Sequence, residues 1–154
     1  MGIISKVTKN IEGKAHYHKF PVWYEYTVGV AGEIFAKNLK EQGLLTGAKC
    51  PCCGKVYLPP RVYCEECFEE IKEFLALEPV GVVETYCEVY EDIDGNRFDK
   101  PKVVAFVRID GSCGGLFGFI EGSVQMGDKV KAQLVEKRKR TGTVSDIVCF
   151  KKVG

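Results

Sequence analysis

Two closely spaced pairs of cysteines constrain this chain more than any other feature of its sequence. Cys50 and Cys53 form the first pair, and Cys64 and Cys67 form the second pair after ten intervening residues. A Cys-x-x-Cys turn places two sulfur atoms at two corners of a zinc tetrahedron, and a second such turn supplies the other two corners. Gly54, directly after the first pair, supplies the backbone freedom that this turn needs, because its amide is expected to turn toward a sulfur. The pattern predicts a closed site for one structural zinc ion, with no position left open for water.

A disulfide pair and a redox-active Cys-x-x-Cys motif are the alternative interpretations of these cysteines. The N-terminus, Met1 to Lys6, lacks the apolar run and the cleavage site of a signal peptide. No stretch approaches the roughly 18 apolar residues that span a membrane. We therefore expect a cytoplasmic chain, in which paired cysteines more often bind metal than form disulfides. Cys52 is a competing ligand within the first pair, but the two-residue spacing and Gly54 favour Cys50 and Cys53.

Helical spacing precedes the cysteines, over Tyr24 to Gln42. Its apolar residues recur at intervals of three and four, and they are Ala31, Ile34, Phe35 and Leu39. Gly43 predicts the end of this helix. Gly29 and Gly32 weaken its start, so we expect a helix that is firm only from about Gly32, or broken there.

From Pro79 onward the period changes to that of β-strands, with β-branched and aromatic residues between turn signals. The five predicted strands are Val80 to Tyr90, Val103 to Ile109, Leu116 to Ile120, Lys129 to Val135 and Val144 to Phe150. Five strands over this length are typical of an OB-type barrel. The expected fold is mainly β, with an N-terminal helix, a rubredoxin-like four-cysteine zinc ribbon and a five-stranded OB-fold barrel.

Three predicted parts follow from these patterns. Residues 1–43 form an N-terminal tail and helix, and residues 78–154 form the OB-fold domain. Residues 44–77 form the zinc ribbon and end in a predicted short helix over Cys67 to Phe74. The ribbon has few apolar residues, so the metal is expected to contribute to its stability.

Charge argues against a nucleic-acid partner, because 22 Lys and Arg against 21 Asp and Glu leave a net charge of +1. The only dense basic run is Lys137, Arg138, Lys139 and Arg140. It is interpreted either as a solvated loop or as a contact for an anionic partner, such as a cofactor phosphate or a nucleic-acid backbone.

An aromatic group lies ahead of the helix and consists of Phe20, Trp23, Tyr24 and Tyr26. Core packing is its default interpretation, and a docking face for a partner is the second.

The sequence offers little for catalysis. Cys113 lies in a Gly-rich turn, but a thiolate nucleophile needs a base, and the two histidines, His16 and His18, are distant in the sequence. We expect Cys113 to be a turn residue, and Cys87 and Cys149 to be small buried hydrophobic residues. No paired carboxylates and no phosphate-binding loop occur in the sequence, so no catalytic residue is expected.

The order of these parts resembles the zinc-ribbon/OB-fold acyl-CoA-associated family, over about residues 24 to 150. The motifs that carry the resemblance are the first cysteine pair with Gly54, Pro59-Pro60-Arg61 ahead of the second pair, Gly127-Asp128-x-Val130 before the fourth strand, and Tyr26 to Gly32. Members of this family are small non-catalytic subunits that accompany thiolase-type enzymes. In archaea they resemble scaffolds that join acetoacetyl-CoA thiolase to hydroxymethylglutaryl-CoA synthase.

The resemblance implies a hetero-oligomer with a thiolase-superfamily enzyme and no contact with a membrane. The ribbon and the helix would dock the enzyme, and the barrel would shelter part of an acyl-CoA. The basic run at 137–140 would suit the CoA phosphates. Residues around the cysteines, namely Tyr57, Arg61 and Tyr63, would contact the partner. The competing hypotheses are a single-stranded nucleic-acid-binding OB-fold protein and an independent enzyme that uses Cys113.

Overall fold

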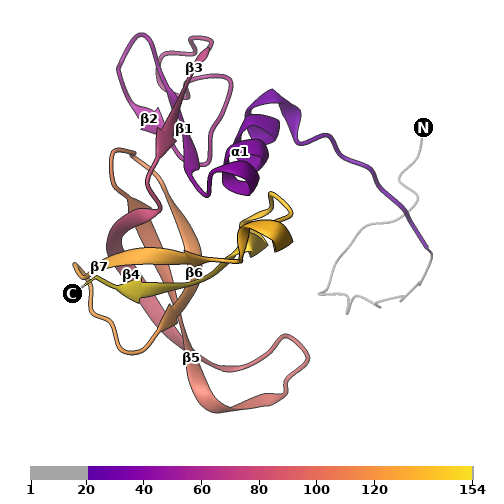
Figure 1. Cartoon of the computed structure of the whole chain (residues 1–154), viewed down its shortest axis with the longest axis vertical. Helices are drawn as coiled ribbons and strands as arrows, with labels where there is room; N and C mark the ends of the chain where they lie inside the picture. Colours follow the sequence, from indigo (N-terminus) through magenta and orange to yellow (C-terminus); the bar gives the residue numbers. More distant parts are fainter. Residues whose placement is uncertain (1–20, 154) are drawn as a thin grey trace, which may run out of the picture.

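The structure, a computed structural model, describes residues 21–153. A three-stranded ribbon lies above a five-stranded barrel, and the single described helix lies beside both (Figure 1). The elements are α1 (Gly29–Glu41), β1 (Leu45–Lys49), β2 (Val56–Tyr57), β3 (Glu73–Leu77), β4 (Val80–Glu91), β5 (Arg97–Ile109), β6 (Gly115–Glu121), β7 (Lys129–Leu134), the 3-10 turns η1 (Lys137–Lys139) and η2 (Val144–Asp146), and β8 (Ile147–Lys152). The predicted fold class is confirmed. No helix in the described part of the chain is long and apolar enough to cross a membrane.

Helix α1 is continuous from Gly29, so the expectation of a helix that is firm only from Gly32 is wrong. The Gly29 amide donates to the Thr27 hydroxyl at 3.1 Å at the start of the helix. Burial of Ala31 and Leu39 then stabilises the whole length through tertiary packing, which outweighs the low helix propensity of two glycines. At the other end Gly43 adopts a φ of +74°, and its amide donates to the carbonyl groups of Asn38 and Leu39. Gly43 therefore ends the helix as predicted.

The ribbon is an antiparallel sheet with the strand order β2-β1-β3. The short helix predicted over Cys67 to Phe74 is wrong, because this segment is a turn that leads into β3. Backbone amides in and beside this turn form hydrogen bonds across it rather than along a helix. The Cys64 amide donates to the carbonyl of Glu69, and the Ile71 amide donates to that of Val62. Phe68 takes a φ of 56°, which a right-handed helix excludes.

The barrel closes in the order β4-β5-β6-β8-β7. All its neighbouring strands are antiparallel except β6 and β8, which pair in parallel at Ile120 and Phe150. Strand β5 begins at Arg97, earlier than predicted, because β4 and β5 continue beyond the barrel as a long hairpin (Figure 1). The last predicted strand is correct only from Ile147, since Val144–Asp146 forms η2.

Asp146 explains why the chain turns before β8. Its carboxylate is buried and accepts hydrogen bonds from the amides of Thr141, at 2.9 and 3.0 Å, and Gly142, at 2.7 Å. Burial alone would raise the pKa of Asp146, but these hydrogen bonds outweigh it and hold the pKa below its usual range. The carboxylate thus organises the β7–β8 connection, which also carries the basic run.

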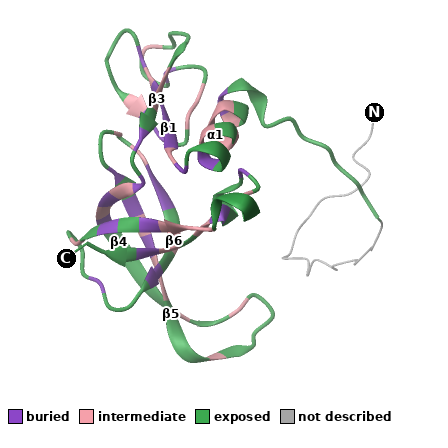
Figure 2. Cartoon of the chain, viewed as in Figure 1, coloured by how far each residue is buried: buried purple, intermediate pink, exposed green. Residues whose placement is uncertain are grey.

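One hydrophobic core joins the helix, the base of the ribbon and the barrel. Leu39 of α1, Leu45 of β1 and Leu58 after β2 belong to the same cluster of buried residues as Val107 and Phe150 of the barrel. The buried segments in Figure 2 run through all three parts. The arrangement of ribbon, helix and barrel is therefore set by packing rather than by a linker.

Candidate metal centre and partner-facing surface

The structure brings together the four cysteines that the sequence pattern singled out. Cys50 follows β1, Cys53 lies in the turn after it, and Cys64 and Cys67 lie in the opposite turn of the ribbon. Their four sulfur atoms all lie within 4.8 Å of one another, and the sulfurs of Cys53 and Cys64 are 3.8 Å apart. Zinc–sulfur bonds of about 2.3 Å in a tetrahedron give a sulfur–sulfur edge of about 3.8 Å, so the four residues fit a zinc ion.

Backbone amides support the cluster from within each turn. The Cys53 amide donates to the sulfur of Cys50 at 3.5 Å, and the Cys67 amide donates to that of Cys64 at 3.4 Å. Gly54 has a φ of +72°, but its amide donates to the carbonyl of Cys50 and not to a sulfur. Cys52, the competing ligand of the sequence analysis, is exposed and lies outside the cluster.

Tyr57 lies at this centre rather than on the surface of the ribbon. It was expected to contact a partner, but its side chain is only 3 % exposed, and its hydroxyl lies 3.1 Å from the sulfur of Cys64. The Tyr57 hydroxyl is the main influence that lowers the pKa of the Cys64 thiol, to about 6, and the same contact raises the pKa of Tyr57. Arg61 covers the Tyr57 ring at 4.6 Å. Of the three residues expected to face a partner, Tyr63 is the most exposed.

The remaining cysteines differ in their surroundings. Cys113 is a turn residue, as predicted, and its thiol donates to the carbonyl of Val56 at 3.1 Å, so it connects the barrel to the ribbon. The burial predicted for Cys87 is wrong, because Cys87 is exposed on β4; Cys149 is only half-buried. His16 and His18 lie outside the described residues.

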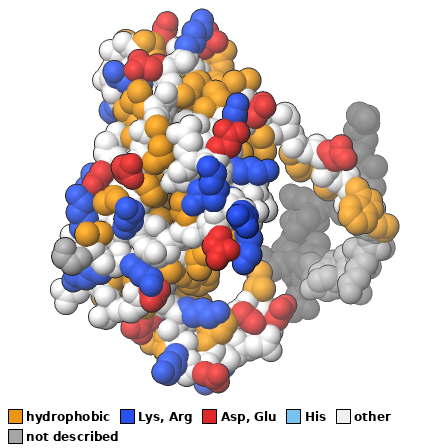
Figure 3. All heavy atoms as spheres, in the orientation of Figure 1, with side chains coloured by type: hydrophobic (Ala, Val, Ile, Leu, Met, Phe, Trp, Pro, Cys, Tyr) orange, Lys and Arg blue, Asp and Glu red, His pale blue; other side chains and the backbone are white. Residues whose placement is uncertain are grey.

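Residues 21–28 form an extended arm that leads into α1. Trp23 is 93 % exposed and Tyr26 is 83 % exposed, and Tyr24 is also exposed, so core packing of the aromatic group is wrong for these three residues. Phe20 lies outside the described residues. Figure 3 shows apolar side chains of the arm standing clear of the body of the molecule.

An apolar groove of about 500 Å³ begins where the arm joins α1. It is bounded by α1, the loop after β2, the start of β6 and η2. Its lining residues are Val28, Gly29, Val30, Ala31, Gly32, Phe35, Pro59, Pro60, Val62, Leu116 and Val144. Val28, the last residue of the arm, lines this groove, so the arm leads directly into it.

The basic run lies in and directly after η1, close to α1 (Figure 1). Lys137, Arg138 and Lys139 are exposed, and Lys139 pairs with Glu136 at 3.4 Å. Arg140 is half-buried and donates from Nε to the carbonyl of Val135 at 2.9 Å, so it is part of the loop's own structure. Positive side chains gather where α1 meets the β7–β8 connection (Figure 3).

Comparison with known proteins places this site in a family. Residues 38–73 match the family model described as ChsH2, rubredoxin-like zinc ribbon domain. A solved protein of unknown function from the DUF35 family of Sulfolobus solfataricus is 33 % identical, with a TM-score of 0.64 over 84 % of this chain and 87 % of that chain. The chain belongs to the DUF35 family.

Two further DUF35 relatives are described as DUF35 domain-containing scaffold proteins. The relative from Methanothermobacter thermautotrophicus is 28 % identical over 99 residues, which are 62 % of this chain and 74 % of the relative. The relative from Methanocaldococcus jannaschii is 36 % identical over 81 residues, which are 48 % of this chain and 53 % of the relative. A solved Ltp2-ChsH2(DUF35) aldolase shares the fold, with a TM-score of 0.57 and 17 % identity over 83 % of this chain and 97 % of that chain.

Proposed function

We propose that this DUF35 protein is a non-catalytic scaffold subunit that docks onto a thiolase-superfamily enzyme and helps to form its acyl-CoA site. We further propose that Cys50, Cys53, Cys64 and Cys67 hold one structural zinc ion in the ribbon. The scaffold proteins among its relatives support the first part, and the geometry of the four sulfurs supports the second. A closed four-cysteine site holds no reactive water, so its zinc stabilises the ribbon and supplies no chemistry.

The exposed arm is the observation that carries the docking proposal. Trp and Tyr contribute most of the binding energy in many protein interfaces, and here they are exposed on residues 21–28 beside an apolar groove. An exposed apolar surface of this kind marks an interaction site rather than a stable free surface. In the proposed complex the arm and α1 lie against the enzyme, and the zinc holds the ribbon rigid next to them.

Trp23→Ala is expected to weaken binding of the enzyme at least about thirtyfold, because a central Trp contributes about 2 kcal/mol or more to a typical interface. The tagged chain is first isolated from its host, and the protein that co-purifies is identified by mass spectrometry. The dissociation constant is then measured for the purified pair by calorimetry.

Ile93→Ala is the matched control for Trp23→Ala. Ile93 is a fully exposed apolar residue in the β4–β5 turn, and it does not line the apolar groove. Its replacement is expected to leave the dissociation constant unchanged. Recovery of the chain without any acyl-CoA enzyme, or equal effects of the two variants, would contradict the docking proposal.

The CoA contact is proposed for Lys137 and Arg138 of the basic run. Both side chains are exposed, and neither takes part in an ion pair within residues 21–153. Lys139 is paired with Glu136, and Arg140 donates a hydrogen bond within the loop. Binding a phosphate through either side chain would therefore compete with an existing interaction. Arg and Lys bind phosphate through charge-assisted hydrogen bonds, which suits the nucleotide end of an acyl-CoA.

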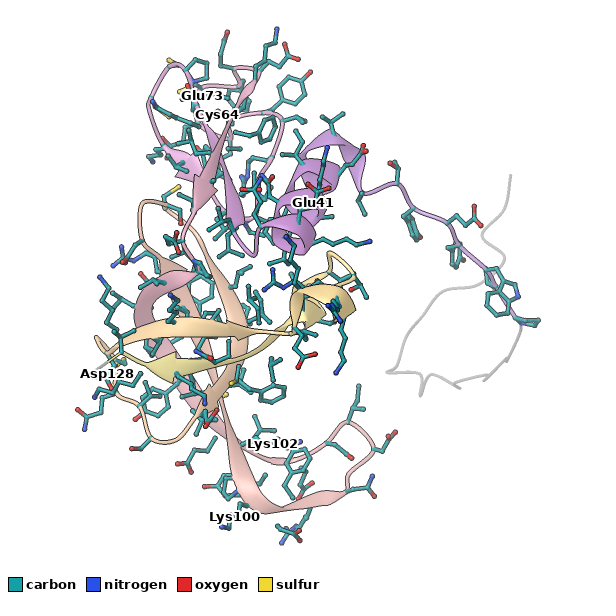
Figure 4. All side chains as sticks on the ribbon, in the orientation of Figure 1. Glu41, Cys64, Glu73, Lys100, Lys102 and Asp128 are labelled. Atoms are coloured by element: carbon teal, nitrogen blue, oxygen red, sulfur yellow. The ribbon has the colours of Figure 1, made fainter. Side chains whose placement is uncertain are left out.

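Lys137→Glu combined with Arg138→Glu is expected to raise the KM of the complex for acyl-CoA at least about tenfold, because charge-assisted hydrogen bonds to phosphate are lost. The increase should be smaller with a dephosphocoenzyme A thioester, which lacks one phosphate. Lys100→Glu combined with Lys102→Glu makes the same change in net charge on β5, away from the basic run, and serves as the control (Figure 4). An equal increase in KM for the control would show an effect of overall charge and would refute the contact.

A further inference from the structure

Tyr57 makes a contact that a four-cysteine site does not require for its tetrahedral geometry. Its hydroxyl oxygen lies 3.1 Å from the sulfur of Cys64, inside the ribbon. Cys64 is itself buried, and the Cys67 amide approaches the same sulfur at 3.4 Å. The sulfur of Cys64, a residue labelled in Figure 4, thus has two hydrogen-bond partners, the Cys67 amide and the Tyr57 hydroxyl.

The Tyr57 ring is held in a single position by its surroundings. Tyr57 lies on β2 and pairs with Ala48 of β1, and it packs in the small core of the ribbon. The Arg61 guanidinium lies 4.6 Å from the ring centroid, and Arg61 in turn pairs with Glu65. Within residues 21–153 the hydroxyl has the sulfur of Cys64 as its hydrogen-bond partner. A buried phenol hydroxyl needs such a partner, so its direction toward the sulfur is determined by the fold.

We propose that Tyr57 is a positioning residue for the zinc ion, whose O–H group donates to the thiolate of Cys64 in the loaded site. This inference rests on the zinc part of the proposed function. Four thiolates around one Zn²⁺ give the centre two net negative charges, and each donor to sulfur offsets part of that charge. The donor also withdraws electron density from the sulfur. Tyr57 therefore slows both the loss of zinc and the reaction of Cys64 with electrophiles, in the way that residues around first ligands tune other metal sites.

Tyr57→Phe tests this role, because it removes the hydroxyl and keeps the ring under Arg61. Tyr63→Phe is the matched control, since Tyr63 lies next to Cys64 in the chain but is 59 % exposed. Transfer of zinc to a chromogenic pyridylazo chelator is expected to be about ten times faster for Tyr57→Phe than for the wild type, and unchanged for Tyr63→Phe.

Two further readouts separate this role from simple packing. In protein loaded with cobalt(II), the sulfur-to-cobalt charge-transfer band of Tyr57→Phe should move to lower energy, because the thiolate becomes richer in electrons. Alkylation of zinc-loaded protein, mapped by mass spectrometry, should become faster at Cys64 than at Cys50.

Failure of the zinc site and failure of the role of Tyr57 give different results. Wild-type protein that contains no zinc by elemental analysis would refute the zinc site itself. Zinc in both proteins, with equal transfer rates and superimposable cobalt spectra, would overturn the role of Tyr57 and leave the zinc site intact.

Discussion

Replacing Cys64 with serine is expected to remove the zinc and to unfold the upper part of the ribbon. The buried cluster around the site contains only five residues, Ala48, Cys50, Tyr57, Cys64 and Ile71. A core of this size does not hold a fold alone, so metal binding and folding of the ribbon are one process. Serine does not supply a thiolate, and the Tyr57 hydroxyl loses its partner in the same variant. Elemental analysis should therefore find about one zinc per wild-type chain and almost none in Cys64→Ser.

Cys87→Ser is the control for this experiment. Cys87 is exposed on β4 and lies outside the four-cysteine cluster, so its replacement should leave the zinc content and the thermal transition unchanged. Zinc retained by Cys64→Ser would contradict the assignment of Cys64 as a ligand. Equal loss of zinc from Cys87→Ser would show that the loss is not specific to the four-cysteine cluster. The base of the ribbon should partly survive in Cys64→Ser, because Leu45, Leu58 and Leu77 belong to the larger core shared with the barrel.

Gly114→Ala is expected to lower the free energy of unfolding by about 3 kcal/mol, the upper end of the usual cost of overpacking. A Cβ atom at Gly114 would lie 1.8 Å from the carbonyl oxygen of Leu58 and 2.9 Å from its carbonyl carbon. These are backbone atoms of a buried residue, so they cannot move aside as a flexible side chain would. The substitution should push the β5–β6 loop of the barrel away from the ribbon. Equilibrium unfolding in urea measures the loss.

Cys113→Ala is the neighbouring control in the same loop. It removes one weak hydrogen bond from the thiol to the Val56 carbonyl and keeps the hydrogen bond that the Cys113 amide donates to the same carbonyl. We therefore expect the free energy of unfolding to fall by less than about 1 kcal/mol. If Gly114→Ala lowered the free energy of unfolding no more than Cys113→Ala does, the close approach of loop and ribbon would not contribute to stability. Unchanged activity of the reconstituted complex with Cys113→Ala would also exclude a catalytic role for this thiol.

Sequence reasoning succeeded where the signal is local. The spacing of the two cysteine pairs has few interpretations, and Gly43 ends α1 through its own backbone conformation. Alternating β-branched and aromatic residues likewise predicted all five barrel strands, although not their exact ends. It failed where residues distant in the chain decide the outcome. The turn after Cys67 looks helical until the cross-turn hydrogen bonds to Val62 and Glu69 are known.

Exposure was the least predictable property of this chain. Residue type predicts burial for Trp23, Tyr26 and Cys87, because aromatic side chains and free cysteines are usually buried. All three are nevertheless exposed. Tyr57 and Tyr63 both lie between the two cysteine pairs and are the same residue type, but one is buried against Cys64 and the other is on the surface. No periodicity distinguishes them, because the two-residue strand β2 is too short to show one.

The sequence by itself determined which four cysteines form one cluster and the order of helix, ribbon and barrel along the chain. Each of these depends on spacing or composition over a few residues, which the chain carries in any conformation. Only the tertiary structure decided that Tyr57 faces a sulfur, that Gly114 meets Leu58, and that the arm at residues 21–28 stays uncovered. These are contacts between segments, or the lack of them. They depend on how one shared core positions the ribbon, α1 and the barrel against each other.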